Sequence, residues 1–266
     1  MHNRRFDQAA KKDPFWNVFA GRILFALGLI GLGAVGFIVG DFIVGRPPTW
    51  SERYLPPGWI IYLSNALLML AGFAILLQRM ILQSGLLLGV LILLLSLSRH
   101  FPIFFRDWTN AFKDLALFGG SLIVACSGST SHTLLIPVFS QSAWKNDLFY
   151  GGMVMMAVFF LSCGYAHFKF ADFVMHYIPG YIPFHFFWAY FCGICLLAAG
   201  LGFFIPKLRR RAAFLSGLMV LSWFLLVHIP RTITNPASAT EAMGLFESLS
   251  FSGILLVISG LTPRPT

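Results

Sequence analysis

A group of ionisable residues borders the long apolar runs of this sequence, where side chains could bind a small molecule or transfer protons. The group consists of Asp41, Arg99, His100, Asp114, His167, Lys169, Asp172, His185, His228, Arg231 and Glu247. Charged groups in or beside a bilayer are costly, and they usually face a cavity or a partner. The group therefore predicts a polar site at the outer membrane face, because the topology described below brings its members to that side.

A structural role competes with the functional one for part of this group. Asp114 and Glu247 fall in the first turns of apolar runs, where the helix dipole stabilises a negative charge. We expect Asp114, together with Glu241 and Arg106, to form paired charges at helix ends. The residues for which we favour a binding site are His167, Asp172, His185 and His228.

The histidines suggest a quinone more readily than a metal or a haem. Near neutral pH, histidine can bind a metal, move a proton or hydrogen-bond a quinone carbonyl. The histidine and cysteine residues lack the close spacing of a zinc site. His100 and His228 lie near prolines at the ends of apolar runs, which are poor positions for axial haem ligands. The cofactor stays unknown, with quinone as the candidate, and we expect neither metal nor haem.

Cys192 and Cys195 form a Cys-x-x-Cys pair, and their spacing puts both sulfurs on one face of a helix. A redox dithiol in the middle of a membrane could exchange only with a lipid-soluble partner such as quinone. Cysteine also packs well as a small apolar residue. Packing is the simpler interpretation, and the redox alternative stays open.

The elements that must position these residues are membrane-spanning helices. Hydrophobic residues make up 58% of the chain and charged residues 11%, against about 25% charged residues in soluble proteins. A helix needs about 20 mostly apolar residues to cross the hydrocarbon core. The candidate runs are 23–43, 59–78, 80–98, 111–128, 149–171, 183–205, 212–229 and 243–260. The sequence predicts an all-α polytopic membrane protein with these eight transmembrane helices.

The net charge of +9 is a signal of topology. With eight spans, the basic excess collects on the side of the N-terminus and includes the turn from Lys207 to Arg211. Basic loops stay in the cytoplasm, so both termini are predicted to be cytoplasmic. We expect a multi-pass protein of a bacterial cytoplasmic (inner) membrane, with the lipid bilayer as its partner and no nucleic acid.

The two halves of the chain look like copies of one module. His100-x-Pro102 matches His228-x-Pro230, and Gly72 and Gly200 are separated by the same number of residues as His100 and His228. A repeat of this kind predicts a duplicated four-helix unit. The predicted parts are a tail (1–22), a first module (23–128), a cytoplasmic linker (129–148), a second module (149–260) and a C-terminal tail (261–266). We expect each module to form its own four-helix bundle.

Several motifs resemble the DoxX/DoxD family of membrane proteins. They are Tyr165-x3-Lys169-x2-Asp172, Ala198-Ala199-Gly200 and the segment from Phe112 to Gly120 (FKDLALFGG). The resemblance implies a four-helix membrane module. It also implies a membrane subunit of a quinone- or sulfur-linked redox system, with other membrane redox subunits as partners.

Three functions stay open at this point. The chain could be a redox subunit, a binder or transporter of a small molecule with an outer-face polar cavity, or a structural partner of a membrane complex. The sequence does not decide whether it is an enzyme. For Asp172 we predict a partner for the carboxylate, either Lys169, His228 or Arg231, because an unpaired buried carboxylate is costly.

Overall fold

The computed structural model describes residues 15–45, 56–128 and 142–263. Most of the predicted tail 1–22 and linker 129–148 and the last residues of the tail 261–266 lie outside this part of the chain. The same holds for residues 46–55.

Helices make up nearly all of the described residues. In chain order they are α2 (Phe15–Val39), α3 (Gly58–Leu76), α4 (Ile81–His100), the 3-10 turn η2 (Phe101–Ile103), α5 (Trp108–Cys126), α6 (Ser142–Lys169), α7 (Ala171–Tyr177), α8 (His185–Phe204), α9 (Pro206–Trp223), the π-helical turn η4 (Phe224–His228), α10 (Ile229–Thr234) and α11 (Ala239–Leu261). The rest of the described chain consists of turns and short connections. The predicted all-α class is confirmed.

Seven stretches of the described chain are helices long and apolar enough to cross a membrane. They are α2, α3, α4, α6, α8, α11 and Pro206–Thr234, which joins α9, η4 and α10. The chain is therefore a multi-pass membrane protein by helix length and hydropathy. The predicted fourth span corresponds to α5, which is not among the seven. Its first turns carry the polar residues Asn110, Lys113 and Asp114.

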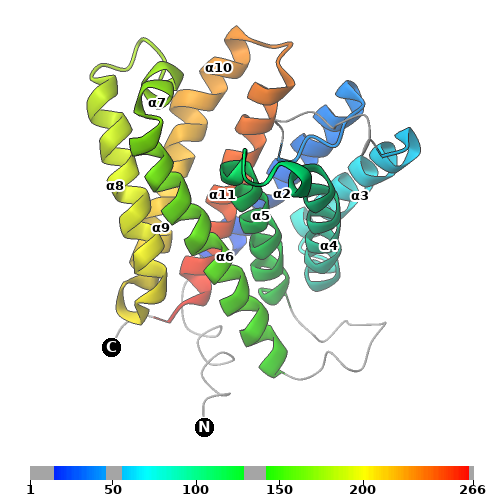
Figure 1. Ribbon diagram of the computed structural model, residues 1–266. Coiled ribbons are helices and arrows are strands. Elements are labelled where there is room, and N and C mark those ends of the chain that lie inside the picture. Colours follow the sequence, from blue (N-terminus) through cyan, green and yellow to red (C-terminus); the bar gives the residue numbers. More distant parts are fainter. Residues whose placement is uncertain (1–14, 46–55, 129–141, 264–266) are drawn as a thin grey trace.

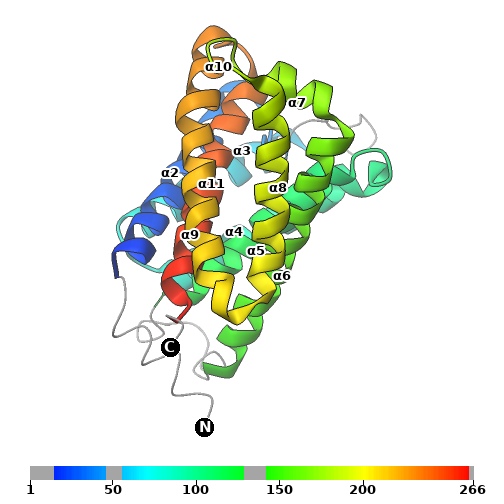
Figure 2. The same cartoon turned by 90° about the vertical axis from the view of Figure 1, so that its left-hand side faces the viewer.

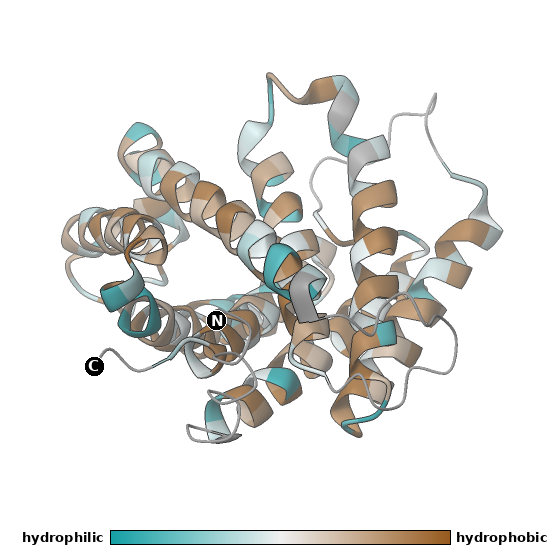
Figure 3. Ribbon diagram, turned by 90° about the horizontal axis from the view of Figure 1, so that it is seen from below, coloured by the Kyte–Doolittle hydropathy of each residue, from teal (hydrophilic) through white to brown (hydrophobic). Residues whose placement is uncertain are grey.

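The long helices pack side by side in a closed ring. α5 and α11, which are not neighbours in this ring, also contact each other. Around the ring the order is α2, α3, α4, α5, α6, α8, α9 and α11, and α11 packs along α2 to close it. Figures 1 and 2 show α7 and α10 at one end of the molecule, with the end of α11 and the connection between α8 and α9 at the other. In Figure 3, seen from the end opposite α7 and α10, the helices are mostly hydrophobic.

The packing crosses the boundary between the two predicted modules. α2 packs along α11 and α6 packs along α5, so the first helix of each module contacts the last helix of the other. A Cβ added to Gly21 of α2 would lie 2.6 Å from the Gly253 oxygen of α11, and one added to Gly119 of α5 would lie 2.9 Å from the Gly152 oxygen of α6. Small residues let helix backbones approach closely in lipid. These glycines explain why the two cross-boundary pairs form.

Two helix boundaries differ from the sequence-based expectation. The backbone leaves the helical conformation at Phe170 (φ −119°, ψ 40°), so Asp172 lies in the separate helix α7 and not at the end of α6. Ile205 is extended (φ −94°, ψ 110°) and α9 begins directly afterwards at Pro206. Proline suits the first helical position, so the basic residues from Lys207 to Arg211 lie in the first turns of a helix and not in a loop.

Candidate functional site

The first polar group is the Asp114 cluster, where the turn after α2 meets α4, α5 and α11. Its members are Asp41, Arg99, His100, Lys113, Asp114 and Glu247. Arg99 Nη2 lies 2.8 Å from Asp41 Oδ1, His100 Nδ1 lies 2.7 Å from Asp114 Oδ2, and Lys113 Nζ lies 2.9 Å from Glu247 Oε2. His100, Asp114 and Glu247 are 3%, 3% and 4% exposed. Pairing offsets the cost of burying such groups.

The turn that follows α2 closes over this cluster. Asn65 Nδ2 donates a hydrogen bond to the Asp41 carbonyl oxygen (3.1 Å), and Arg99 Nη1 donates to the Val44 carbonyl oxygen (3.3 Å). The Gly45 amide donates to Glu247 Oε1 (2.9 Å). Gly45 has a φ of +75°, and a Cβ there would overlap the Asp114 carboxylate. Only glycine meets both demands without strain.

The connection from α4 to α5 brings His100 and Asp114 together. α4 ends at His100, and the 3-10 turn η2 follows with Pro102 near its start. Asp107 caps α5 by accepting a hydrogen bond from the Asn110 amide (3.4 Å). Asp114 lies on the buried side of α5, two turns from this cap, and meets the end of α4.

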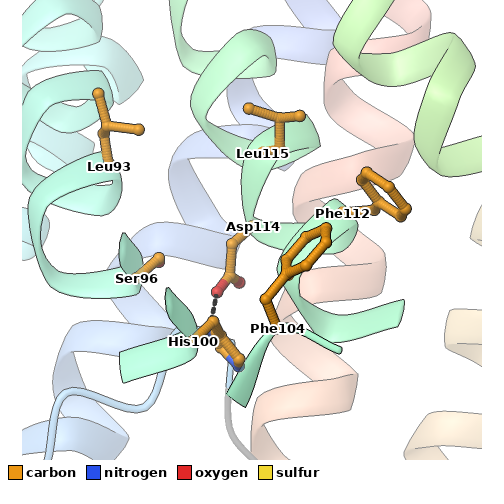
Figure 4. Close-up of a pocket in the computed structure, with 8 residues that line it drawn as sticks. Leu93, Ser96, His100, Phe104, Phe112, Asp114 and Leu115 are labelled. Carbon is orange, nitrogen blue, oxygen red and sulfur yellow. Dashed lines mark ion pairs between the residues drawn. The ribbon is translucent and has the colours of Figure 1, made fainter. Parts of the chain in front are cut away.

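A small apolar pocket lies beside the His100–Asp114 pair, and we call it the Asp114 pocket. It has a volume of about 170 Å³ and is lined by Leu93, Ser96, His100, Phe104, Ala111, Phe112, Asp114 and Leu115. Figure 4 shows the ion pair between His100 and Asp114 at its wall, with Phe104 and Phe112 next to it. The charged groups of this pocket are engaged with each other, as expected of a structural ion pair.

A second and larger pocket lies between α6, α7, α8 and the end of η4, and we call it the His228 pocket. It has a volume of about 250 Å³ and is lined by His167, Phe173, Val174, Tyr177, Ile178, Trp188, Cys192, Trp223, Val227 and His228. His167 Nδ1 lies 2.9 Å from the Cys163 carbonyl oxygen, and its ring stacks on Trp223 with centroids 6.2 Å apart. Aromatic rings therefore form much of the wall.

His228 differs from the other members of this pocket in its hydrogen bonding. Its Nδ1 atom is buried and has no hydrogen-bond partner in the described part of the chain. That nitrogen lies against Gly244 of α11, where an added Cβ would be only 3.0 Å away. His228 is the last residue of the π-helical turn η4. The wider π turn changes the direction of the residues at its end, and such turns are frequent at functional sites.

A network of hydrogen bonds lies beside the pocket, at the end of the molecule that carries α7 and α10. Arg231 forms two hydrogen bonds to Glu241, at 2.9 Å and 2.5 Å. The Tyr177 hydroxyl donates to Glu241 Oε2 (3.3 Å), and the Arg231 guanidinium stacks 3.7 Å from the centre of the Tyr177 ring. Burial raises the pKa of Tyr177 to about 12, with Glu241 as the next cause. Tyr177 therefore keeps its proton and acts as a donor at neutral pH.

The remaining predicted site residues do not join either group. Asp172 is exposed, and its carboxylate has no ion pair or hydrogen bond with the described residues. Each of its three predicted partners has other contacts, so the predicted pairing is wrong. Lys169 Nζ lies 5.4 to 5.9 Å from the ring centres of Trp108, Tyr165 and Phe170. Because Asp172 faces out from α7, it does not need a buried partner.

His185 and the cysteine pair have simple environments. His185 Nε2 lies 3.2 Å from the Pro179 carbonyl oxygen. Cys192 and Cys195 are both free thiols, and only Cys192 lines the His228 pocket. Among the residues that the structure describes, no three of the types histidine, cysteine, aspartate and glutamate are grouped so as to hold a metal ion.

Three important residues were absent from the sequence-based set. Lys113 provides the ion pair to Glu247 across the two predicted modules, and its place next to Asp114 in an apolar run was a usable signal. Tyr177 joins the pocket to Glu241. Gly244 leaves the space that the His228 ring occupies. A spacing pattern gives no sign of Tyr177 or Gly244, because both depend on how α7 and α11 meet.

A family model described as "Domain of unknown function (DUF8561)" matches residues 156–247. The matched segment runs from α6 into α11 and includes every residue that lines the His228 pocket. No curated protein matches the chain, and no solved structure matches it. None of these findings supports the resemblance to the DoxX/DoxD family. The chain is thus similar, over this segment, to a family without an assigned function.

Proposed function

We propose that this membrane protein binds a small lipid-soluble molecule in the His228 pocket, with His228 as its main hydrogen-bonding contact. The observation that carries the proposal is that His228 lines the pocket while its Nδ1 atom, buried against Gly244, has no hydrogen-bond partner in the described residues. Buried polar atoms are nearly always satisfied, and exceptions often mark functional sites. His100, at the matching position of the first half, is paired to Asp114.

The surroundings of His228 favour one tautomer of its ring. An N–H at Nδ1 would point at the Gly244 backbone, where no acceptor is found among the described residues. A bare Nδ1 can instead accept a weak contact from the Gly244 Cα–H. The neutral ring then carries its proton on Nε2 and can donate it to a carbonyl or hydroxyl oxygen of a ligand.

The pocket walls define the chemical class of the ligand. Trp188, Trp223 and Phe173 offer apolar and aromatic surface, which suits a flat ring. The volume of about 250 Å³ is near the lower limit for ligand pockets, about 300 Å³. A single ring with a carbonyl group fits, and a longer tail would extend into lipid. A quinone head group is the example that we propose to test first.

The redox role remains part of this proposal in a limited form. A quinone in the His228 pocket would be compatible with a membrane subunit of a quinone- or sulfur-linked redox system, as the DoxX/DoxD-like motifs suggested. Cys192 lines the pocket, so one thiol would lie beside such a ligand. The alternatives are transport of the bound molecule and a structural role in a membrane complex. No catalytic residue is assigned.

We also propose a duplicated architecture with an exchange of helices. The contact of α2 with α3 in the first half corresponds to that of α6 with α8 in the second half. The contact of α4 with α5 likewise corresponds to that of α9 with α11. With α5 counted as an eighth span, residues 23–128 and 149–260 would be two modules that each place their last helix against the other module. Both termini and the linker would face the cytoplasm of a bacterial inner membrane. Reporter fusions in the linker and within residues 46–55 should then report opposite sides, and fusions on the same side would contradict this topology.

Ligand binding can be followed through the tryptophans of the pocket. Decylubiquinone should quench the intrinsic fluorescence of the detergent-solubilised protein in a saturable way, because Trp188 and Trp223 line the pocket. His228→Leu should weaken binding about tenfold, as expected for about 1.4 kcal/mol from one hydrogen bond. His176→Leu is the matched control, because His176 is exposed and its Nδ1 atom lies beside the Asp172 carbonyl oxygen.

Decylbenzene is the second probe, because it has an apolar ring and tail but no oxygen acceptor. It should bind the unmodified protein and the His228→Leu variant equally well. Decylubiquinone affinity that is unchanged in His228→Leu, or reduced equally in His176→Leu, would contradict the proposal.

A further inference from the structure

The short helix α7 and the residue after it form one wall of the His228 pocket, through Phe173, Val174, Tyr177 and Ile178. α7 follows one candidate span and precedes another. In the described structure, none of the side chains of α7 is buried. Segments with few buried apolar contacts open locally at a low cost in free energy. α7 is therefore suited to move away from the rest of the pocket.

Both ends of α7 depart from helical geometry. Phe170 before it has a φ of −119° and a ψ of 40°, and Ile178 after it is extended (φ −71°, ψ 127°). Gly180 follows two residues later, and the Tyr181 hydroxyl then donates to the Leu226 carbonyl oxygen of η4. Hinges usually consist of a few residues at the ends of elements, where the backbone angles change. α7 is thus a rigid segment between a break in the helix and a loop that Tyr181 anchors.

Arg231 of α10 holds α7 against the pocket. Its Nη1 atom donates to the Tyr177 carbonyl oxygen (3.2 Å), and its guanidinium carbon lies 3.7 Å from the centre of the Tyr177 ring. The Tyr177 hydroxyl donates to Glu241 (3.3 Å), which also accepts a hydrogen bond from Arg231. The centroids of the Tyr177 and His228 rings are 6.0 Å apart. One tyrosine therefore joins the wall of the pocket to the ion pair between α10 and α11.

The contact between Arg231 and Tyr177 can open without stranding the arginine. Neither Arg231 nor Glu241 lines the pocket, and both lie at the end of the molecule that carries α7 and α10 (Figure 2). The Arg231 side chain is 24% exposed, so water can accept its hydrogen bonds when α7 moves away. The pair with Glu241 does not depend on α7, because it joins α10 to α11.

We propose that α7 is a lid of the His228 pocket and that Arg231 is the positioning residue that keeps this lid closed. A lipid-soluble ligand enters and leaves the pocket while the contact between Arg231 and Tyr177 is broken. The inference rests on the proposed function, because it concerns access to the same pocket.

The test uses Arg231→Lys, which keeps a cation beside Glu241 but loses the planar group that stacks on Tyr177. In stopped-flow measurements of tryptophan quenching, decylubiquinone should associate and dissociate about five- to tenfold faster, as expected for the loss of one hydrogen bond and one cation–π contact. The Kd should stay nearly unchanged, because the closed lid loses the same contacts with and without ligand. A merely structural role would lower affinity or stability and would not accelerate association.

Arg209→Lys is the matched control. Arg209 Nε also donates to a carbonyl oxygen, that of Phe203 (2.8 Å), and its guanidinium carbon lies 5.4 Å from the centre of the Tyr150 ring. These contacts are made in the first turns of α9, at the opposite end of the molecule from α7. Both rates in this variant should therefore match those of the unmodified protein.

Hydrogen–deuterium exchange of the ligand-free protein tests the lid separately. The amides of residues 171–177 should exchange about five- to tenfold faster in Arg231→Lys than in the unmodified protein, and Arg209→Lys should not change them. If Arg231→Lys does not fold, Tyr177→Phe takes its place, because it removes only the hydroxyl contact with Glu241. That variant should raise the exchange about two- to fivefold.

Unchanged exchange over residues 171–177 would overturn the lid. Faster exchange with unchanged association and dissociation rates would overturn it as well, because α7 would then open without controlling access. A failure of the unmodified protein to bind decylubiquinone in a saturable way would instead contradict the proposed function, and the control of access with it. The exchange result would still show whether Arg231 holds α7.

Discussion

His100 and His228 are each followed by a proline two residues later, yet their surroundings differ in one decisive respect. α4 stays α-helical up to His100, and the ring pairs with Asp114 at 2.7 Å. The π-helical turn η4 precedes Ile229 in the second half, and His228 lies against Gly244 with its Nδ1 unsatisfied among the described residues. Glu247 of α11 pairs with Lys113 of α5 instead.

This difference separates a structural role from a functional one. In the Asp114 cluster, each buried charge has a partner, so removal of one side chain would strand another. In the His228 pocket, Nδ1 lies against Gly244 without a hydrogen-bond partner among the described residues, and Nε2 is the nitrogen that we propose donates to a ligand. The same residue type can therefore hold a fold together at one place and be available to a ligand at the other.

The largest expected effect comes from breaking the ion pair that links the two halves. Lys113→Met leaves Glu247 buried without its cation, and loss of one member of a buried pair costs about 3–5 kcal/mol. We expect a clear decrease in the free energy of unfolding, measured by denaturant titration in detergent. Lys169→Met is the control, because Lys169 is exposed and its Nζ lies against aromatic rings without an ion pair among the described residues. Equal stability of the two variants would show that the cluster does not hold the halves together.

A smaller effect is expected from filling the space beside His228. An added Cβ at position 244 would lie 3.0 Å from His228 Nδ1 and 3.2 Å from its Cε1. Gly244→Ala should shift the ring and weaken decylubiquinone binding about three- to tenfold, while a tight fit of this kind costs about 1 kcal/mol of stability. Gly151→Ala is the control, since nothing lies within 4 Å of an added Cβ there. Unchanged affinity in Gly244→Ala would mean that the position of His228 does not matter for binding.

The smallest effect concerns the pH dependence of stability. The pKa of Tyr177 is raised from 10.0 to about 12 in the folded protein. A raised pKa contributes stability that is complete below the unfolded value and is lost as the pH rises through the folded value. Stability should therefore fall between pH 10 and about 12, and Tyr177→Phe should reduce the slope of this fall in thermal unfolding. Tyr62→Phe serves as the control. If both variants change the slope equally, the loss of stability does not come from deprotonation of Tyr177.

Much of the helical architecture could be predicted from the sequence, because apolar runs of spanning length leave few alternatives to helices. The pairing of α2 with α11 and of α5 with α6 could not, since it depends on where Gly21, Gly253, Gly119 and Gly152 meet. Sequence reasoning placed Asp114 at a helix end but expected a partner for Asp172. The break at Phe170 moves Asp172 onto an exposed helix, and spacing along the chain gives no sign of that break.

The candidate site was predicted only in outline. His167 and His228, both in the predicted outer-face group, line one pocket. The pattern could not distinguish His228 from His100, because both belong to the same His-x-Pro motif. The distinction arises from the π turn and from Gly244, which are properties of the packed helices.

The most direct test of this account compares His100→Leu with His228→Leu in both stability and decylubiquinone binding. His100→Leu should reduce stability, because it strands Asp114, while the folded protein keeps its affinity. His228→Leu should keep its stability and lose about tenfold in affinity, the equivalent of about 1.4 kcal/mol. A result in which both variants lose stability and affinity together would contradict the account, because the two histidines would then have the same role.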